Sequence, residues 1–205
     1  EKIVIPDEYE GAPVTKISDF AAVNLEYVTE ISIGKNVKEI GVWAFENNQK
    51  VTAINVDDNN KYFCDVDGVL FTKDMSPVVA YPNALNDQYT LPTHTTKVGN
   101  GAFATCSSLK SVTLHGAVTS VGNYAFYNCT AMDTAVISSS VTSIGDKAFS
   151  DCTALTSLTV PSSVSSIGED VLTGSSAVAS IKTPSSSAFA QWCITNGLSD
   201  KIVNN

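Results

Sequence analysis

Three cysteines recur at a fixed spacing, and regularly spaced thiols can bind a metal or form disulfides. Cys106, Cys129 and Cys152 lie 23 residues apart. Zinc motifs place two ligands a few residues apart and then repeat the pair, and this chain has no Cys-x-x-Cys. In stacked copies, the thiols would point in parallel rather than at each other. We therefore predict an inward row of small buried side chains, and we expect all five cysteines, including Cys64 and Cys193, to be reduced.

Carboxylates offer a second kind of chemistry, because clustered aspartates can bind calcium. Asp57, Asp58, Asp65 and Asp67 lie close together in the sequence. An EF-hand loop needs carboxylates at positions 1, 3 and 5, Gly at 6 and Glu at 12, and this stretch lacks that spacing. We favour solvated turn residues over a calcium loop, and we expect no metal or cofactor.

Histidine chemistry is limited to His94 and His115, the only two histidines. The sequence contains no G-x-S-x-G elbow, H-E-x-x-H motif or Gly-rich phosphate loop. A Ser-His-Asp triad stays open, since its members need not be adjacent in sequence. A hydrolase is therefore our third hypothesis, and it requires one of these histidines within hydrogen-bond reach of a Ser or Cys and a carboxylate. We expect a protein that is not an enzyme.

The net charge and the lengths of the apolar runs argue against two kinds of partner, nucleic acids and membranes. The 205 residues are 43% hydrophobic and carry a net charge of -9, so the chain can bury a core and repels phosphate backbones. We expect no nucleic-acid partner. No apolar run approaches the ~20 residues that span a bilayer, so we expect no membrane insertion. The chain opens at Glu1 with no initiator Met, and we expect an export signal that has been removed.

The cysteine spacing belongs to a repeat that positions these side chains. Most copies contain an apolar residue followed by Gly and, shortly after it, an Ala-Phe pair. In the final copy, Val171-Leu172 stands in place of the pair. Residues 14 to 36 form a degenerate first copy of the repeat. The wide gap between Ile40 and Val98 indicates an insertion. The apolar residue before Gly is Ile40, Val98, Val121, Ile144 or Ile167.

Each copy also contains the pattern L-x-x-L-x-L, the strand signature of leucine-rich repeats. Leu155, Leu158 and Val160 are one example. Side chains alternate faces along a strand, so the last two apolar residues of each trio point inward together. Stacking copies ~4.8 Å apart pairs their backbones and makes one continuous core. We predict a β-rich, right-handed, leucine-rich-repeat-like solenoid of about six 23-residue repeats.

The repeat breaks at two places. Residues 61–92 indicate a β-meander: apolar runs at 62–66, 69–72 and 78–81 are separated by turns at Asp67-Gly68 and at 73–77. After Pro184, the serines at 185–187 can cap a helix over 188–196, and Gly197 is placed to end it. We expect Phe189, Trp192 and Cys193 to pack this helix onto the last repeat as a cap. The predicted single domain, 1–205, comprises a lead-in at 1–13, repeats at 14–60, the insertion at 61–92, repeats at 93–184 and a cap at 185–205.

These residues resemble the BspA-type leucine-rich repeats. The stretch VTSIGDKAFSDCTALTSLTVPSS, residues 141–163, follows the family pattern V-T-x-I-G-x-x-A-F-x-x-C-x-x-L-x-x-V-x-[IL]-P-x-S almost position by position, and IVIPDEYEGAPVTKIS resembles its lead-in. One departure is that Cys precedes the strand trio here, whereas the ordinary leucine-rich repeat places Asn or Cys after it. The resemblance implies a bacterial protein that is exported, held on the cell surface and engaged in adhesion to host or microbial proteins or glycans.

The outward strand positions are our candidate binding face. They are mostly small and hydroxylated, which equally suits soluble strand formation. We predict that this face binds a protein or glycan, and the alternative is a structural spacer within a larger surface protein. We expect a monomer. The candidate residues are Ser32, Asn55, Ser111, Thr113, Thr134, Val136, Ser157, Thr159 and Lys182.

Overall fold

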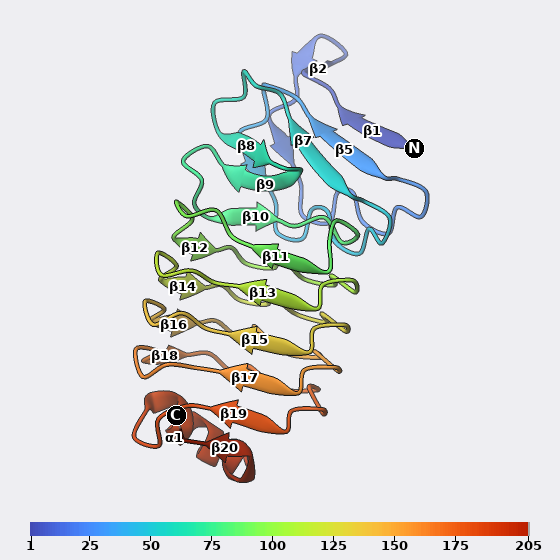
Figure 1. Ribbon diagram of the computed structural model, residues 1–205. Helices are drawn as coiled ribbons and strands as arrows, with labels where there is room; N and C mark the ends of the chain where they lie inside the picture. The colour runs from blue at the N-terminus through green and yellow to red at the C-terminus, as the bar shows by residue number, and fades with distance from the viewer. Residues whose placement is uncertain (205) are drawn as a thin grey trace.

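The chain winds into a β-solenoid in which long strands form one side and short strands the other (Figure 1). A computed structural model describes residues 1–204. The long strands are β1 (Lys2–Ile5), β5 (Glu30–Ile33), β7 (Ala53–Val56), β11 (Gln88–Thr90), β13 (Ser111–Thr113), β15 (Thr134–Val136), β17 (Ser157–Thr159) and β19 (Ser180–Lys182). The short strands are β4 (Lys16–Ile17), β6 (Glu39–Ile40), β12 (Lys97–Val98), β14 (Ser120–Val121), β16 (Ser143–Ile144) and β18 (Ser166–Ile167).

The 23-residue repeat is confirmed by the strand register. Val112 pairs with Ala135, and Ala135 pairs with Leu158, each in parallel strands. The second and third apolar residues of the trios lie in the core, as alternation along a strand requires; Leu158 and Val160 are fully buried. Behind them, Phe126 is stacked between two other phenylalanines. Each rung thus buries its apolar side only against its neighbours.

The β-meander is also confirmed, and it joins the short-strand sheet. β8 (Phe63–Val66), β9 (Val69–Thr72) and β10 (Val78–Ala80) pair antiparallel, and β10 then pairs in parallel with β12. The β8–β9 hairpin packs on β7, so β7 and β11 are not paired and the long strands form two sheets. Figure 1 shows the consequence: β1, β5 and β7 run at a steeper angle than the strands after the meander.

Two stretches outside the predicted repeats also supply long strands. β1, in the lead-in, pairs in register with β5, from Lys2 opposite Glu30 to Ile5 opposite Ile33. β11 lies within the 61–92 segment, yet it pairs with β13 because Tyr89 lies 23 residues before Val112. The structure therefore has more rungs than the six predicted copies. A short hairpin of β2 (Glu8–Tyr9) and β3 (Ala12–Pro13) follows β1.

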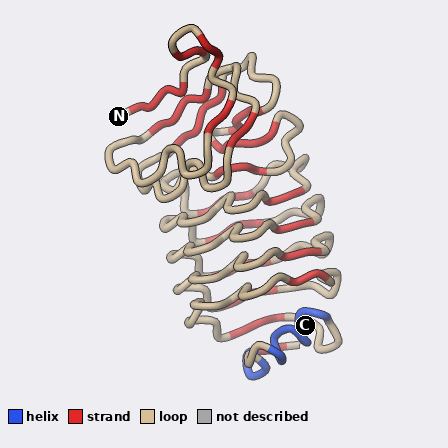
Figure 2. The backbone as a smooth tube through the Cα atoms, turned by 180° about the vertical axis from the view of Figure 1, so that it is seen from behind, coloured by secondary structure: helices blue, strands red, loops and turns tan. Residues whose placement is uncertain are grey.

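The C-terminal cap is confirmed as a helix beneath the last rung (Figure 2). α1 (Ala188–Thr195) begins at Ser187, whose Oγ accepts a hydrogen bond from the Ala190 amide at 3.0 Å. Gly197 has a φ of 73°, a left-handed conformation that suits the end of a helix. The cap continues through η1 (Ser199–Lys201) into β20 (Ile202–Val203). β20 pairs with β19 and covers its free edge, an addition that the sequence pattern did not predict.

Candidate functional site

Seven of the nine candidate residues lie on one sheet, which is formed by β11, β13, β15, β17, β19 and β20. They form two columns, because parallel pairing in register places equivalent residues of successive rungs side by side. Ser111, Thr134 and Ser157 follow one another in the first column. The second column runs through Thr113, Val136, Thr159 and Lys182. We call these two columns the front face.

The front face is nearly free of charge, although the chain as a whole carries -9. Lys182 is its one ionic side chain across β11, β13, β15, β17 and β19. Val136 is 57% exposed, whereas its inward neighbours Ala135 and Ile137 are buried. The strand backbones use their own hydrogen bonds in the sheet, so a ligand here would meet hydroxyl groups and methyl groups.

Sequence reasoning missed part of each column. Gln88 and Thr90 of β11 extend them by one rung, opposite Ser111 and Thr113. The signal was available, because these residues lie 23 positions before their partners. It was hidden by Tyr89, an aromatic residue at a position that other copies fill with an aliphatic one.

Ser32 and Asn55 lie apart from the other seven candidate residues, on the sheet of β1, β5 and β7. The β8–β9 hairpin separates the two sheets: a Cβ on Gly68 would lie 2.9 Å from that of Ala53. Around Ser32 and Asn55 lies a shallow hollow of about 360 Å³, lined also by Val4, Asp7 and Asp57. The nine residues therefore form two surfaces rather than one.

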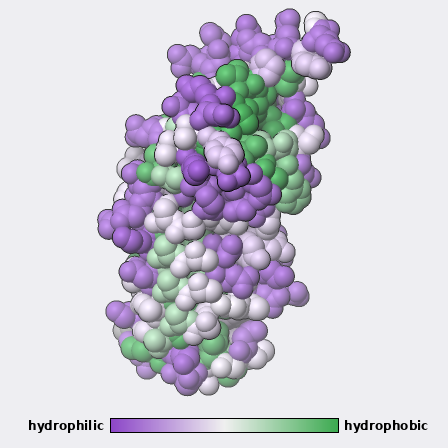
Figure 3. All heavy atoms as spheres, turned by 90° about the vertical axis from the view of Figure 1, so that its right-hand side faces the viewer, coloured by the Kyte–Doolittle hydropathy of each residue, from purple (hydrophilic) through white to green (hydrophobic). Residues whose placement is uncertain are grey.

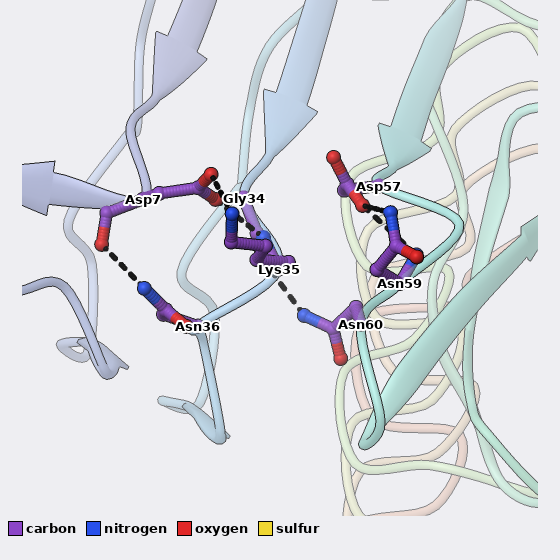
Figure 4. A network of polar contacts seen from close by, with 7 residues as sticks. All are labelled: Asp7, Gly34, Lys35, Asn36, Asp57, Asn59 and Asn60. Atoms are coloured by element: carbon purple, nitrogen blue, oxygen red, sulfur yellow. Dashed lines mark hydrogen bonds and ion pairs between the residues drawn. The ribbon is translucent and has the colours of Figure 1, made fainter.

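The strand ends beside this hollow are held by a polar network (Figure 4). The Asp7 carboxylate accepts a hydrogen bond from the Lys35 amide at 2.7 Å, and Asn36 Nδ2 donates to the Asp7 carbonyl at 3.0 Å. Asn60 Nδ2 donates to the carbonyls of Gly34 and Val37. These side chains form hydrogen bonds with backbone groups at the points where the strands end. The network therefore stabilises the turns and has a structural role.

Of the aspartates considered for calcium, Asp57, Asp58 and Asp67 lie at turns, whereas Asp65 lies within β8. Asp57 accepts hydrogen bonds from the backbone and side chain of Asn59, which lowers the pKa of its carboxyl group. Asp65 accepts from the Val56 amide at 2.7 Å. Within residues 1–204, no three His, Cys, Asp or Glu side chains gather in a way that would hold a metal ion.

The cysteine row is a hydrogen-bonding ladder inside the core. The thiols of Cys129 and Cys152 donate to the carbonyls of Phe103 and Phe126, 26 residues earlier, at 3.0 Å each. In the next rung, Ser175 occupies the same position and donates to Phe149. Burial raises the pKa of Cys106 and Cys129, so these thiols are held in the protonated form.

All five cysteines are free in the structure, consistent with a structural role for the ladder. Sequence reasoning found the three cysteines but not the other members of the ladder. Asn48 donates to the carbonyl of Ala22, again 26 residues earlier, and the amide oxygen of Asn83 accepts from the Asn48 backbone. The position therefore selects a small buried donor rather than a thiol.

His115 is tied to the backbone. Its Nδ1 accepts a hydrogen bond from the Ala117 amide at 3.1 Å, which leaves the proton on Nε2, 2.5 Å from the Pro92 carbonyl oxygen. With both nitrogens engaged, this ring has neither a free base nor a free donor. The arrangement that a hydrolase would require is not formed at His115.

α1 is the only α-helix in residues 1–204, and the structure there contains no helix of the length and hydropathy that a membrane span requires. Trp192 of α1 is half-buried and stacks on Phe189, with ring centroids 5.4 Å apart. This contact supports the packing role predicted for it.

Several solved structures are similar to this chain. The pneumococcal vaccine antigen PcpA aligns with a TM-score of 0.80 and 24% identity, covering 89% of this chain and 50% of that one. A leucine-rich repeat protein from Eubacterium ventriosum aligns with a TM-score of 0.73 and 27% identity, covering 87% and 48%. A leucine rich cell surface protein from Faecalibacterium prausnitzii gives 0.63 and 23%, covering 94% and 61%. The chain spans about half the length of the first two.

No curated protein sequence matches the chain. The profile of the BspA type leucine rich repeat region does match, in six copies over residues 1–66 and 79–197. The matched residues include the repeats, the whole lead-in and the helix of the cap, and the gap falls within the meander. The expectation drawn from the repeat motif is therefore confirmed: the chain belongs to the BspA-type leucine-rich repeat family.

Proposed function

We propose that the chain is a non-enzymatic recognition module that works outside the cell and binds an extended protein or glycan with its front face. The observation that carries this proposal is the arrangement of the two columns. Each rung carries at least one outward hydroxyl group in register with the next, and the only charge on this face is at Lys182. A ligand with its own regular spacing of polar groups would match such a surface.

The surroundings of the front face support this use. Its rungs are fixed by the core on one side and by parallel pairing along the stack, so the backbone that carries the hydroxyl groups needs no further ordering. The family, and the name of the Faecalibacterium relative as a cell surface protein, support an extracellular setting. We propose a bacterial cell surface as that setting, with host matrix proteins or other microbial surfaces as partners.

One domain should bind weakly. Interface energy is usually dominated by buried aromatic and Arg side chains, and the front face offers neither among its outward residues. Many copies on one surface would still hold firmly, since the second contact forms at the high effective concentration set by the first. We therefore expect binding that depends steeply on surface density.

The same lack of anchor residues favours a second function, a structural spacer. Since this chain covers about half of two solved relatives, further segments accompany similar stacks in those proteins. A spacer would present such segments at a distance from the cell and would bind nothing itself. We also propose a monomer, because α1 and β20 cover the last rung against pairing with a second copy.

The test is a binding screen with the domain at high density on beads, against host matrix proteins and a glycan array. The recognition module predicts a salt-resistant hit that is lost in Thr113→Lys and Thr159→Lys. Lys is tolerated at this position in the column, because Lys182 occupies it one rung below Thr159. A screen without hits at any density would favour the spacer.

A further inference from the structure

A row of strained turns runs along the stack away from the front face. At the second residue of each turn after the short strands, the backbone adopts a left-handed conformation that favours Gly and Asn. Three of the six residues at this position are aromatic, which is unfavourable for the backbone. The six residues are Phe20 (φ 55°), Trp43 (φ 59°), Gly101 (φ 64°), Tyr124 (φ 56°), Lys147 (φ 51°) and Asp170 (φ 54°).

The aromatic residues meet across the junction made by the insertion. Trp43 lies 5.9 Å from Phe20 and 5.2 Å from Tyr124, measured between ring centroids and with edge-to-face geometry in both pairs. Tyr127 stacks on Trp43 at 5.9 Å and also meets Tyr124 edge-to-face at 5.8 Å. Gly101 makes this possible, since a Cβ there would lie 2.7 Å from the Trp43 indole nitrogen. The rung of Gly101 lies between those of Trp43 and Tyr124. Because Gly101 has no side chain, the Trp43 indole can occupy that space.

This cluster is not buried in the core. Phe20 is 56% exposed and its neighbour Val42 is 50% exposed. Figure 3 shows hydrophobic side chains gathered on one flank at the height of the upper rungs, with hydrophilic residues around them and paler rungs below. Within this cluster, Trp43 and Tyr124 are half-buried. Aromatic rings held in unfavourable turns and partly open to solvent form an apolar surface that folding alone does not require.

The cluster borders an open hollow of about 350 Å³ with a neutral lining. It is lined by Phe20, Val42, Trp43, Asn100, Asn123 and Tyr124. The side-chain oxygen of each asparagine already accepts a hydrogen bond from a backbone amide. Asn100 Oδ1 accepts from the Asn123 amide at 2.9 Å, and Asn123 Oδ1 accepts from the Asp146 amide at 3.0 Å. Because a carboxamide has two N–H donors besides its oxygen, both NH₂ groups remain for a ligand.

We propose that this hollow binds a neutral sugar ring of a glycan. The positive C–H edges of a pyranose suit the negative faces of aromatic rings, and its hydroxyl oxygens accept hydrogen bonds from the two amides. The lining has no charged side chain that could pair with an anionic ligand. The Lys147 ammonium already lies 5.8 Å from the Tyr124 ring centroid, so a cationic ligand would meet a like charge there. The hollow is wide open, so one face of the ligand stays in water, which a hydroxylated ring tolerates better than an apolar peptide side chain.

This inference rests on the proposed recognition function and names a ligand class at a second surface. Its rival is a packing role, in which Trp43 only covers the junction between the two parts of the stack. Trp43 also borders a second cavity with Pro77, Tyr81 and Ala102, so its removal would disturb the fold. The test therefore changes Phe20 and Tyr124, and it uses Trp43 as the reporter.

The background is Trp192→Phe, which leaves Trp43 as the only tryptophan of the two in the chain. Trp43 emission is titrated with neutral oligosaccharides chosen from hits on a glycan array. Phe20→Asn and Tyr124→Asn remove rings and place a residue that left-handed turns favour. The relief of backbone strain offsets part of the lost ring contacts, so both variants should stay folded with at most a modest fall in Tm. We expect each to weaken sugar binding by about tenfold. Asp170→Asn, at the same turn position away from the cluster, should leave it unchanged.

Three results would overturn the proposal. Neutral sugars at millimolar concentration could leave Trp43 emission unchanged. Sugar binding could survive both Phe20→Asn and Tyr124→Asn with native Tm. A peptide with an apolar side chain could compete while no sugar does. Thr159→Lys separates this proposal from the front face: loss of bead binding in that variant, without any sugar hit, would leave the recognition module standing and remove only this site.

Discussion

The stacked phenylalanines make a quantitative prediction about what holds the rungs together. Phe126 is fully buried between Phe103 and Phe149, with ring centroids 4.9 Å and 5.1 Å away and interplanar angles of 18° and 10°. Stacked aromatic pairs contribute about 0.5–1.5 kcal/mol each beyond their buried area. Replacing Phe126 with Leu keeps most of the apolar volume but removes both pairs. It should therefore lose about 1–3 kcal/mol more than the change in side-chain size alone.

Phe45 provides the matched control, because it occupies the same repeat position and is only 7% exposed. Within residues 1–204, Phe45 takes part in no aromatic pair. Phe45→Leu should measure the cost of the smaller side chain without the loss of stacking. The difference between the two variants then isolates the contribution of the stack.

The assay is urea unfolding of both variants and the wild type, followed by far-UV circular dichroism and by tryptophan fluorescence. Coincident transitions from the two probes are needed before free energies of unfolding are compared. We expect Phe126→Leu to be the less stable variant by about 1–3 kcal/mol. Equal free energies, to within ~0.5 kcal/mol, would refute the reasoning, because the rungs would then be held by buried area alone.

Three further predictions concern the cap, the thiols and pH. Ser187→Ala should lower the free energy of unfolding by about 1 kcal/mol, measured in urea, because the Ala190 amide loses its 3.0 Å acceptor. A thiol reagent should count five cysteines in denaturant, and fewer than five would contradict the reduced state. In native protein four thiols should react slowly because they are buried, whereas the half-buried Cys64 should react first. Burial raises the pKa of Tyr89 to about 12, so its contribution to stability is full below the ordinary value near 10 and is lost as pH rises toward 12. Thermal unfolding should therefore show a smaller loss of Tm over that range in Tyr89→Phe, and identical pH profiles would count against it.

Much of the fold could be predicted because its determinants are local and recur. The Gly, the Ala-Phe pair and the strand trio pack against equivalent neighbours in every rung. Because the packing is the same, the same residue types recur 23 positions apart. The cysteine position shows the limit of this reasoning. Since a buried donor to the carbonyl 26 residues earlier is what the fold requires, Asn48 and Ser175 serve as well as Cys152, and a search for cysteines overlooks them.

The candidate surfaces were predicted only in part, for the same reason. Within the regular rungs, alternation along the strand placed Thr113 and Thr159 in one column correctly. At the insertion, the register depends on how the β8–β9 hairpin packs against β7, which is not repeated anywhere else in the chain. The sequence pattern therefore could not show that Ser32 and Asn55 lie on a separate sheet, or that Trp43 reaches Tyr124 over Gly101.

The central claim is that the outer face of the long strands performs the recognition. Its most direct test compares two single-lysine variants for binding to the same ligand-coated beads. Thr159→Lys alters the front face, and Ser166→Lys alters the outer side of the short strands, where Lys97 already occupies the same column. Both add one positive charge at a position that accepts Lys in another rung. We predict that Thr159→Lys loses binding while Ser166→Lys keeps it, and equal retention of the two variants would contradict the account.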